Sequence, residues 1–124
     1  MPGRLPTLGA QELALMKVVW RRREVSVRDV YETLRGRRQI AYTTVMTMMN
    51  TLEAKGYLRR TLHGRAYQYR PAVPERRVVK TLVKEFVARV FDGASATLLA
   101  HLVSERELTD DERRELRRLI DEAE

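Results

Sequence analysis

The sequence predicts a mainly α-helical protein that contains one small β-hairpin, and three observations lead to this prediction. Apolar residues recur at helical spacing in three segments before residue 56 and in three more after residue 74. Between them, residues 57–70 have the pattern of two short strands. Pro71 and Pro74 follow this segment and mark a boundary, so we expect one domain at residues 1–72 and another at residues 73–124.

The first part should contain three helices. Apolar spacing predicts the first helix over residues 10–22. Ser26 and Asp29 have the spacing of a capping box and should begin a second helix that Gly36 ends. The third helix is expected over residues 42–55, and Gly56 should terminate it.

A β-hairpin should follow the third helix. Residues 57–62 and 66–70 are the expected strands, and His63, Gly64 and Arg65 would form a three-residue loop between them. Three short helices followed by a hairpin is the order of a winged helix-turn-helix domain. In that fold the third helix enters the major groove of DNA and the hairpin, or wing, reaches the flanking backbone.

The second part should be entirely helical. A long helix is expected over residues 75–91, and Asp92-Gly93 should break it. A shorter helix is expected over residues 96–103. Thr109 and Glu112 form a second capping box, which should open the last helix.

The distribution of charge favours a polyanionic partner for the first part. Residues 1–72 hold 14 Lys and Arg against 5 Asp and Glu, a net +9, whereas residues 73–124 hold 10 against 12, a net −2. A strongly basic domain beside a balanced one is typical of nucleic-acid binding. We therefore expect double-stranded DNA as the partner.

The expected third helix has an uncharged outer face. Its short hydroxyl and amide groups suit base edges and thymine methyls, since they allow close approach without a fixed charge. Residues that we expect to read bases on this face and its flanks are Thr43, Thr44, Met46, Thr47 and Asn50. Residues that we expect to contact phosphates around it are Arg28, Tyr42, His63 and Arg65.

The helical tail should need a partner. About 50 residues bury only a weak core alone, and the long helix is apolar around more than half of its circumference. A homodimer is the economical solution, and its two-fold symmetry predicts pseudo-palindromic operators. The expected dimerisation residues are Val79, Leu82, Val83, Phe86, Val90, Leu98, Leu102, Leu116, Leu119 and Ile120.

Several classes of function are excluded or disfavoured. The chain has no cysteine and two distant histidines, so we expect no metal site and no cofactor. It has no Gly-rich phosphate loop and no nucleophile motif, so an enzyme is not expected. We see neither a signal peptide nor a stretch of about 20 apolar residues. The prediction is a cytoplasmic protein without membrane insertion.

Three segments resemble the penicillinase-repressor family, which includes the methicillin-resistance regulators. The run AYTTVMTMMNTLEAKGYL at residues 41–58 is similar to the recognition helix of that family and its exit. The run GRAYQYRP at residues 64–71 is similar to its wing, and residues 8–20 to its first helix. The resemblance extends over nearly the whole chain.

This resemblance implies a homodimeric repressor of resistance or stress genes. Family members are commonly released when a membrane-bound sensor triggers proteolysis in the helical tail. His101 and Leu102 lie where such a cut would map, which would connect this chain to a sensor or protease pathway. Two other functions remain open: an architectural DNA-binding protein without sequence preference, and a winged-helix adaptor that binds protein.

Overall fold

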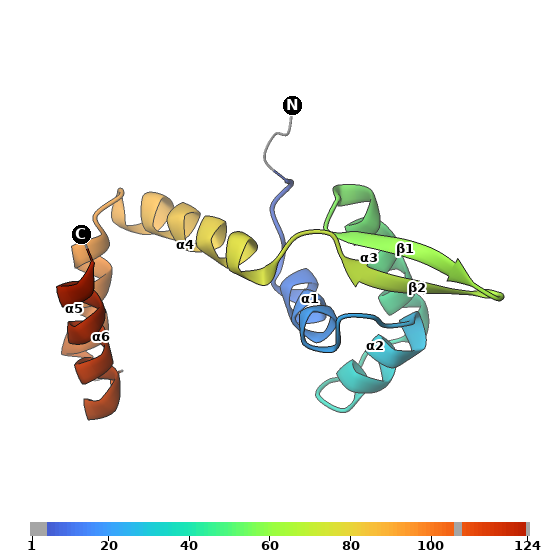
Figure 1. The fold of residues 1–124 in the computed structure, drawn as a ribbon, viewed down its shortest axis with the longest axis horizontal. Helices are drawn as coiled ribbons and strands as arrows, with labels where there is room; N and C mark the ends of the chain where they lie inside the picture. The colour runs from blue at the N-terminus through green and yellow to red at the C-terminus, as the bar shows by residue number, and fades with distance from the viewer. Residues whose placement is uncertain (1–4, 106–107, 124) are drawn as a thin grey trace. The chain divides into compact units, whose positions relative to one another are not determined.

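The computed structural model describes residues 5–105 and 108–123, which form six helices and one two-stranded sheet (Figure 1). This confirms the predicted fold class. The described residues form two compact units, one ending at Val78 and the other beginning at Val79. The elements are α1 (Ala10–Arg22), α2 (Val27–Arg35), α3 (Tyr42–Lys55), β1 (Leu58–His63), β2 (Ala66–Pro71), α4 (Glu75–Phe91), α5 (Ser95–Ser104) and α6 (Asp110–Glu122).

Local sequence signals place the helix ends. At the start of α2, the Ser26 Oγ accepts a hydrogen bond from the Asp29 N–H at 3.0 Å, and the Asp29 carboxylate accepts one from the Ser26 N–H at 2.9 Å. Thr109 and Glu112 form the same reciprocal pair at α6. These bonds satisfy N–H groups that a helix start would otherwise leave without partners. Gly56 ends α3 in the left-handed region at φ 95°.

The hairpin is antiparallel, and its turn is tighter than the sequence suggested. His63 pairs with Ala66, so only Gly64 and Arg65 lie outside the ladder. The expected three-residue loop is therefore wrong. Gly64 has φ 64° and Arg65 does not have a positive φ, which is the pattern of a type II′ turn. Glycine at the first turn position allows the strands to extend to residue 63.

The core of the first unit is formed by apolar side chains from every element of the winged helix. Val25, in the connection between α1 and α2, forms an isolated bridge with Tyr69 of β2. Its N–H and C=O bond the Tyr69 backbone at 3.0 and 2.7 Å, which adds a third extended segment beside the hairpin. Fully buried side chains from this unit are Leu15, Met16, Val19, Val25, Val30, Leu34, Val45, Met49, Leu52, Leu58 and Tyr69.

The first unit continues past the hairpin into the first turn of α4. The Trp20 indole N–H donates a 3.0 Å hydrogen bond to the Val73 carbonyl, and Lys17 pairs with Glu75 at 3.0 Å. Val73 and Val78 are buried. These contacts attach the segment after the hairpin to α1, which is why the first unit ends at Val78 and not at the prolines.

The second unit has little buried surface of its own. Val87 is buried, whereas α5 and α6 contain no buried residue. Phe91 lies edge-on to Phe86 with ring centroids 5.8 Å apart, and its ring is 5.5 Å from that of His101. No single helix in the described part of the chain is long and apolar enough to cross a membrane; α4 and α5 pass that test only as a pair bent by 86°.

A half-buried ion pair joins the start of α1 to the end of α3. Lys55 Nζ lies 2.9 Å from both carboxylate oxygens of Glu12, and the Gly9 N–H donates to the same carboxylate at 2.9 Å. Burial alone would raise the pKa of Glu12. The hydrogen bonds from Gly9 and Lys55 and the lysine charge outweigh it, so the pKa lies below the ordinary value of 4.5.

This pair predicts a pH-dependent stability. Because the pKa of Glu12 is lowered by folding, the carboxylate stabilises the fold above its ordinary pKa, and the contribution disappears as the pH falls through the folded-state value. Glu12→Gln should lower the free energy of unfolding by about 1 kcal/mol at pH 7, and the difference should vanish near pH 2 in urea unfolding experiments. Glu32→Gln, which breaks an exposed pair with Arg35, should have little effect at either pH. A difference for Glu12→Gln that does not change with pH would contradict this assignment.

Candidate nucleic-acid interface

Helix α3 exposes the face that the sequence predicted to read bases. Val45, Met49 and Leu52 are buried and attach the helix to the core. The side chains on the opposite side and its flanks are exposed, and none of them is charged. They are Thr43, Thr44, Met46, Thr47 and Asn50. The helix therefore presents hydroxyls, an amide and a thioether to solvent, because its apolar stripe fixes its rotation against the core.

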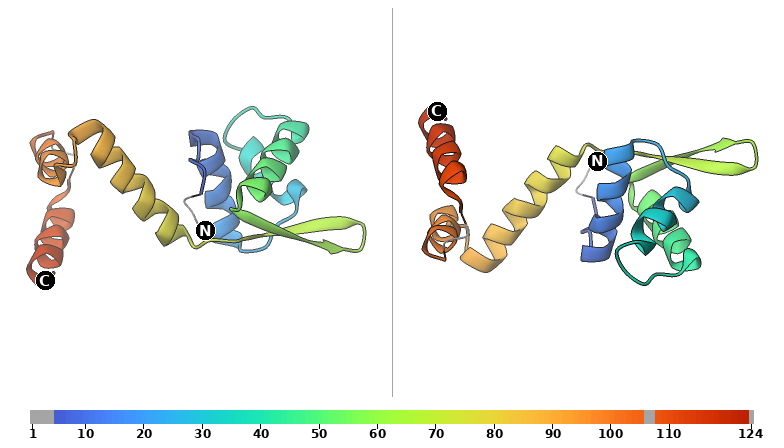
Figure 2. Two further views of the ribbon diagram at one scale, coloured as in Figure 1. Left: turned by 90° about the horizontal axis from the view of Figure 1, so that it is seen from above. Right: turned by 90° about the horizontal axis from the view of Figure 1, so that it is seen from below.

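The hairpin stands beside α3 and projects beyond the helices of this unit (Figure 2). Two-residue turns keep the twist of the strands regular, so the wing is a continuous ribbon up to its tip. Arg65 is exposed in that turn, and His63, also exposed, is the last residue of β1. Both residues thus lie at the end of the wing, as a contact with flanking phosphates requires.

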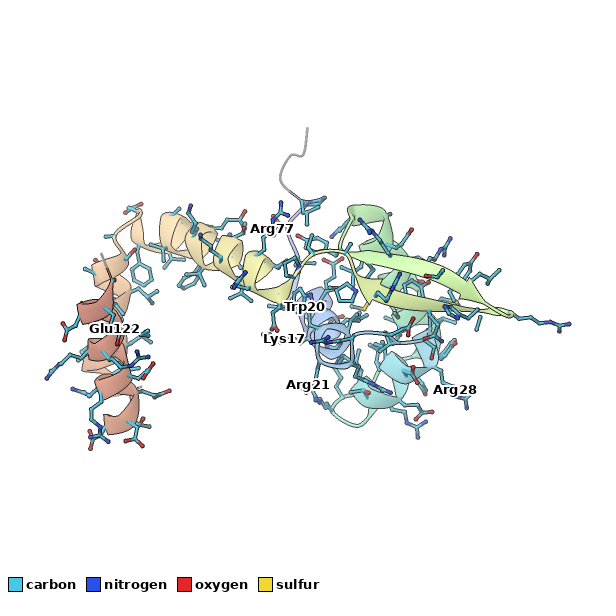
Figure 3. The ribbon with its side chains drawn as sticks, in the orientation of Figure 1. Lys17, Trp20, Arg21, Arg28, Arg77 and Glu122 are labelled. Atoms are coloured by element: carbon cyan, nitrogen blue, oxygen red, sulfur yellow. The ribbon has the colours of Figure 1, made fainter. Side chains whose placement is uncertain are left out.

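The remaining predicted contacts lie near the other end of α3 and on α2. Tyr42, the first residue of α3, is 42% exposed and packs edge-on against Tyr31 with ring centroids 5.4 Å apart. Arg28 is exposed near the start of α2 and extends away from it (Figure 3). Arg28 is free to reach a phosphate, whereas the Tyr42 ring is already positioned by its neighbour.

The structure reveals a polar connection between α3 and the wing that sequence reasoning missed. The Tyr69 hydroxyl donates to Asn50 Oδ1 at 3.2 Å, and Arg60 Nη1 donates to the same oxygen at 3.3 Å. Arg60 also lies over the Tyr67 ring, 4.3 Å from its centroid. Its hydrogen bond with Tyr69 is the main cause that raises the pKa of Arg60 above the ordinary value.

Asn50 thus has a second role. Its amide oxygen is already bonded within the domain, so the side chain orients the wing relative to α3 and has less freedom to bind a base. Arg60 adds a cation next to the uncharged face of α3. Nineteen residues separate Asn50 from Tyr69. Helical spacing in the sequence contains no signal for such a contact.

Metal-ligating side chains do not gather at the site in the described residues. No cluster of three or more His, Cys, Asp or Glu that could hold a metal is present within residues 5–105 and 108–123. The arrangement consists of an exposed helix with short polar side chains, flanked by a basic β-ribbon. These features define a winged-helix domain of the DNA-binding class.

Comparison with known proteins identifies the family. The model of the penicillinase repressor family matches residues 8–122. The chain belongs to this family, which consists of transcriptional regulators and not of enzymes.

Curated relatives align along most of their lengths. The transcriptional regulator BlaI of Mycobacterium tuberculosis is 36% identical over 98% of this chain and 88% of its own. The methicillin resistance regulatory protein MecI of Mammaliicoccus sciuri is 25% identical over 91% of this chain and 92% of its own length. The penicillinase repressor of Bacillus licheniformis is 24% identical over 96% of this chain and 93% of its own length.

Solved structures agree with the fold. The DNA-binding domain of the repressor BlaI is 29% identical to this chain, with a TM-score of 0.54. The match covers 58% of this chain and 88% of that domain. MarR from E. coli has a TM-score of 0.55 over 92% of this chain and 74% of its own, at 13% identity, which is a likeness of fold alone.

The connection between Asn50 and the wing predicts a measurable energetic coupling. Asn50→Ala leaves the buried Tyr69 hydroxyl without an acceptor and should lower the free energy of unfolding by about 1–2 kcal/mol. The matched Thr47→Ala, on the same exposed face, should be neutral or slightly stabilising in the same urea experiment. Adding Tyr69→Phe to Asn50→Ala should restore part of the loss, because neither partner then remains unpaired. Additive losses in the double variant would refute the coupling.

Proposed function

We propose that this protein is a transcriptional repressor that binds pseudo-palindromic operators as a homodimer and reads their sequence with α3. The observation that supports this most directly is the exposed, uncharged face of α3 beside a basic wing. A helix selected only for solubility would carry Glu and Lys there, and Thr is a mediocre helix former. Four threonines in α3 are better explained by contacts with base edges.

Within this proposal, bases and phosphates are bound by different elements. Thr43, Thr44, Met46 and Thr47 would contact base edges, and Asn50 would add a contact through its amide nitrogen, since its oxygen accepts from Tyr69 and Arg60. Cations around the helix would supply affinity without reading sequence. A relative at 29% identity, the monomeric form of BlaI from Bacillus licheniformis, was solved in complex with the blaP half-operator, which supports this mode.

The homodimer is proposed because the second unit lacks a sufficient core. Val83, Val90, Leu119 and Ile120 are each at least half exposed, and Phe86 is 42% exposed. Val79, Leu82, Leu98, Leu102 and Leu116 are half-buried. Burying this apolar surface against a second copy would stabilise both chains by the hydrophobic effect. It would also pair two recognition helices on one operator.

The proposal also covers which genes are regulated, where in the cell the protein acts and how it is released from DNA. The regulated genes would be resistance genes, as the names of the relatives suggest, and the protein would act in the cytoplasm, where DNA is its partner.

Cleavage between His101 and Leu102, triggered by a membrane-linked sensor or protease pathway, would divide α5 and weaken the dimer. A chain cut there should lose operator affinity in gel-shift titrations, and unchanged affinity would remove this step.

The test is selection of genomic fragments by the purified protein at about 150 mM salt, where non-specific binding is weak. The full chain should enrich inverted repeats whose half-sites are about 34–36 Å apart, one helical turn. Ile120→Glu changes a side chain that is 58% exposed, so the chain should still fold, lose dimerisation and enrich single half-sites weakly. Enrichment without a motif would favour an architectural DNA-binding protein. Failure to recover any DNA would favour a protein-binding adaptor.

Arg65 at the tip of the wing should contact a phosphate. Arg65→Ala should weaken binding to operator and random DNA alike and reduce the slope of log affinity against log salt by about one. Arg21→Ala, an exposed arginine at the end of α1, is the charge-matched control and should leave the slope nearly unchanged. An equal change in both variants would mean that only net charge matters.

A further inference from the structure

An open groove of about 550 Å³ lies on the first unit, away from the exposed face of α3. Trp20 and Arg23 at the end of α1, Arg59 and Arg70 at the base of the hairpin, and Pro71, Pro74 and Glu75 line it. Figure 3 shows Trp20 where α1 meets the base of the hairpin. The volume is in the range of sites for small organic ligands, which is about 300–1,000 Å³.

Three arginines and one carboxylate, that of Glu75, line this groove, so positive charge is in excess there. Arg59 and Arg70 are directly opposite each other in the ladder, which places like charges on one face of the hairpin. Opposed like charges destabilise a sheet. Within the part of the chain that the structure describes, none of these three arginines forms an ion pair. The carboxylate of Glu75 is held by Lys17 at 3.0 Å.

The backbone conformation of Arg23 is an independent indication that arginine serves a function at this position. Arg23 ends α1 with φ 73°, in a region that favours glycine, and its N–H bonds the Val19 carbonyl. Glycine adopts a positive φ more readily because it has no Cβ. Arginine here places a third guanidinium in the groove at the expense of backbone strain.

The groove also has a flat apolar surface. The Trp20 indole is half-buried, and its N–H is bonded to Val73, so its ring offers the groove carbon atoms and no free donor. Pro71 and Pro74 add aliphatic surface. Guanidinium groups bind carboxylate and phosphate through paired N–H donors, and an aromatic ring binds a flat apolar group.

We propose that this groove binds a small organic anion, in which a carboxylate or phosphate contacts Arg23, Arg59 and Arg70 and a flat apolar part packs on Trp20. Wing strands and the end of α1 both line the site. A bound anion would therefore stabilise the base of the wing and couple ligand concentration to wing position. The site is separate from the predicted base-reading residues.

Trp20 is the only tryptophan, so its fluorescence reports on the groove directly. We would titrate the full-length protein with benzoate and with phenyl phosphate, which separate the carboxylate and phosphate forms of the anion. Benzamide provides the ring without charge, and acetate the charge without the ring. We expect a saturable change with at least one aromatic anion and a weaker one with both controls.

Substitutions then test the arginines. Arg59→Gln with Arg70→Gln should weaken binding roughly tenfold or more, since two charge-assisted contacts are lost, whereas Arg21→Gln should retain wild-type affinity. Arg23→Gly should weaken binding while it raises the midpoint of urea unfolding, because strain is relieved. These opposite signs separate a ligand contact from a structural role.

Three outcomes would overturn the proposal. The first is no saturable change with either aromatic anion, and the second is an equal response to benzamide. The third is that random-sequence DNA displaces the anion and the paired glutamine variant loses DNA affinity in parallel, which would make the groove a phosphate-backbone contact. Operator selection does not depend on this titration, so either proposal can fail alone.

Discussion

Burial of Tyr69 is the constraint on which the winged helix depends. Its side chain is 2% exposed, its backbone bonds Val25 in both directions, and its hydroxyl reaches Asn50 on α3. One residue of β2 therefore joins the α1–α2 connection, the hairpin and the recognition helix. A buried phenol needs a partner for its hydroxyl, and here Asn50 of α3 supplies it, with the hairpin beside α3. The angle between wing and helix, which decides whether both can contact one DNA duplex, follows from satisfying that hydrogen bond.

In the proposed function, the arrangement of charge around this connection would separate affinity from specificity. Cations of the first unit lie on α1, on α2, on the strands, in the hairpin turn and at the last residue of α3, whereas Thr43, Thr44, Met46, Thr47 and Asn50 on the outer face of α3 are uncharged. A guanidinium in the centre of that face would attract any phosphate and reduce discrimination between sequences. Arg60 instead donates to Asn50 and stacks on Tyr67, so this cation beside the exposed face of α3 is held in position. Fixed cations lose less conformational entropy when they bind a polyanion.

Periodicity and capping chemistry predicted the elements because both are local properties. The Ser26–Asp29 and Thr109–Glu112 boxes, Gly56 and the stripe of Val45, Met49 and Leu52 are each readable within one helical turn or two. The candidate base-reading face followed from the same stripe. Contacts between residues that are far apart in the sequence could not be predicted in this way. They are the Asn50–Tyr69 hydrogen bond, the Lys55–Glu12 ion pair and the groove that Arg23, Arg59 and Arg70 line together with Trp20. The hairpin turn was missed for a related reason, since Gly64 permits either loop length and only the register of the strands decides between them.

The two units differ in how they obtain a core, and that difference has a functional consequence. The first unit buries aliphatic and aromatic side chains from all of its elements, so it can keep a rigid reading surface as a single chain. The second leaves Val83, Val90, Leu119 and Ile120 at least half exposed, and in the proposed homodimer most of its stability would come from association. Stability that depends on association depends on concentration and on an intact tail. In the proposed homodimer, a change in the tail alone would lower operator affinity, while the residues proposed to contact DNA remain folded and unchanged.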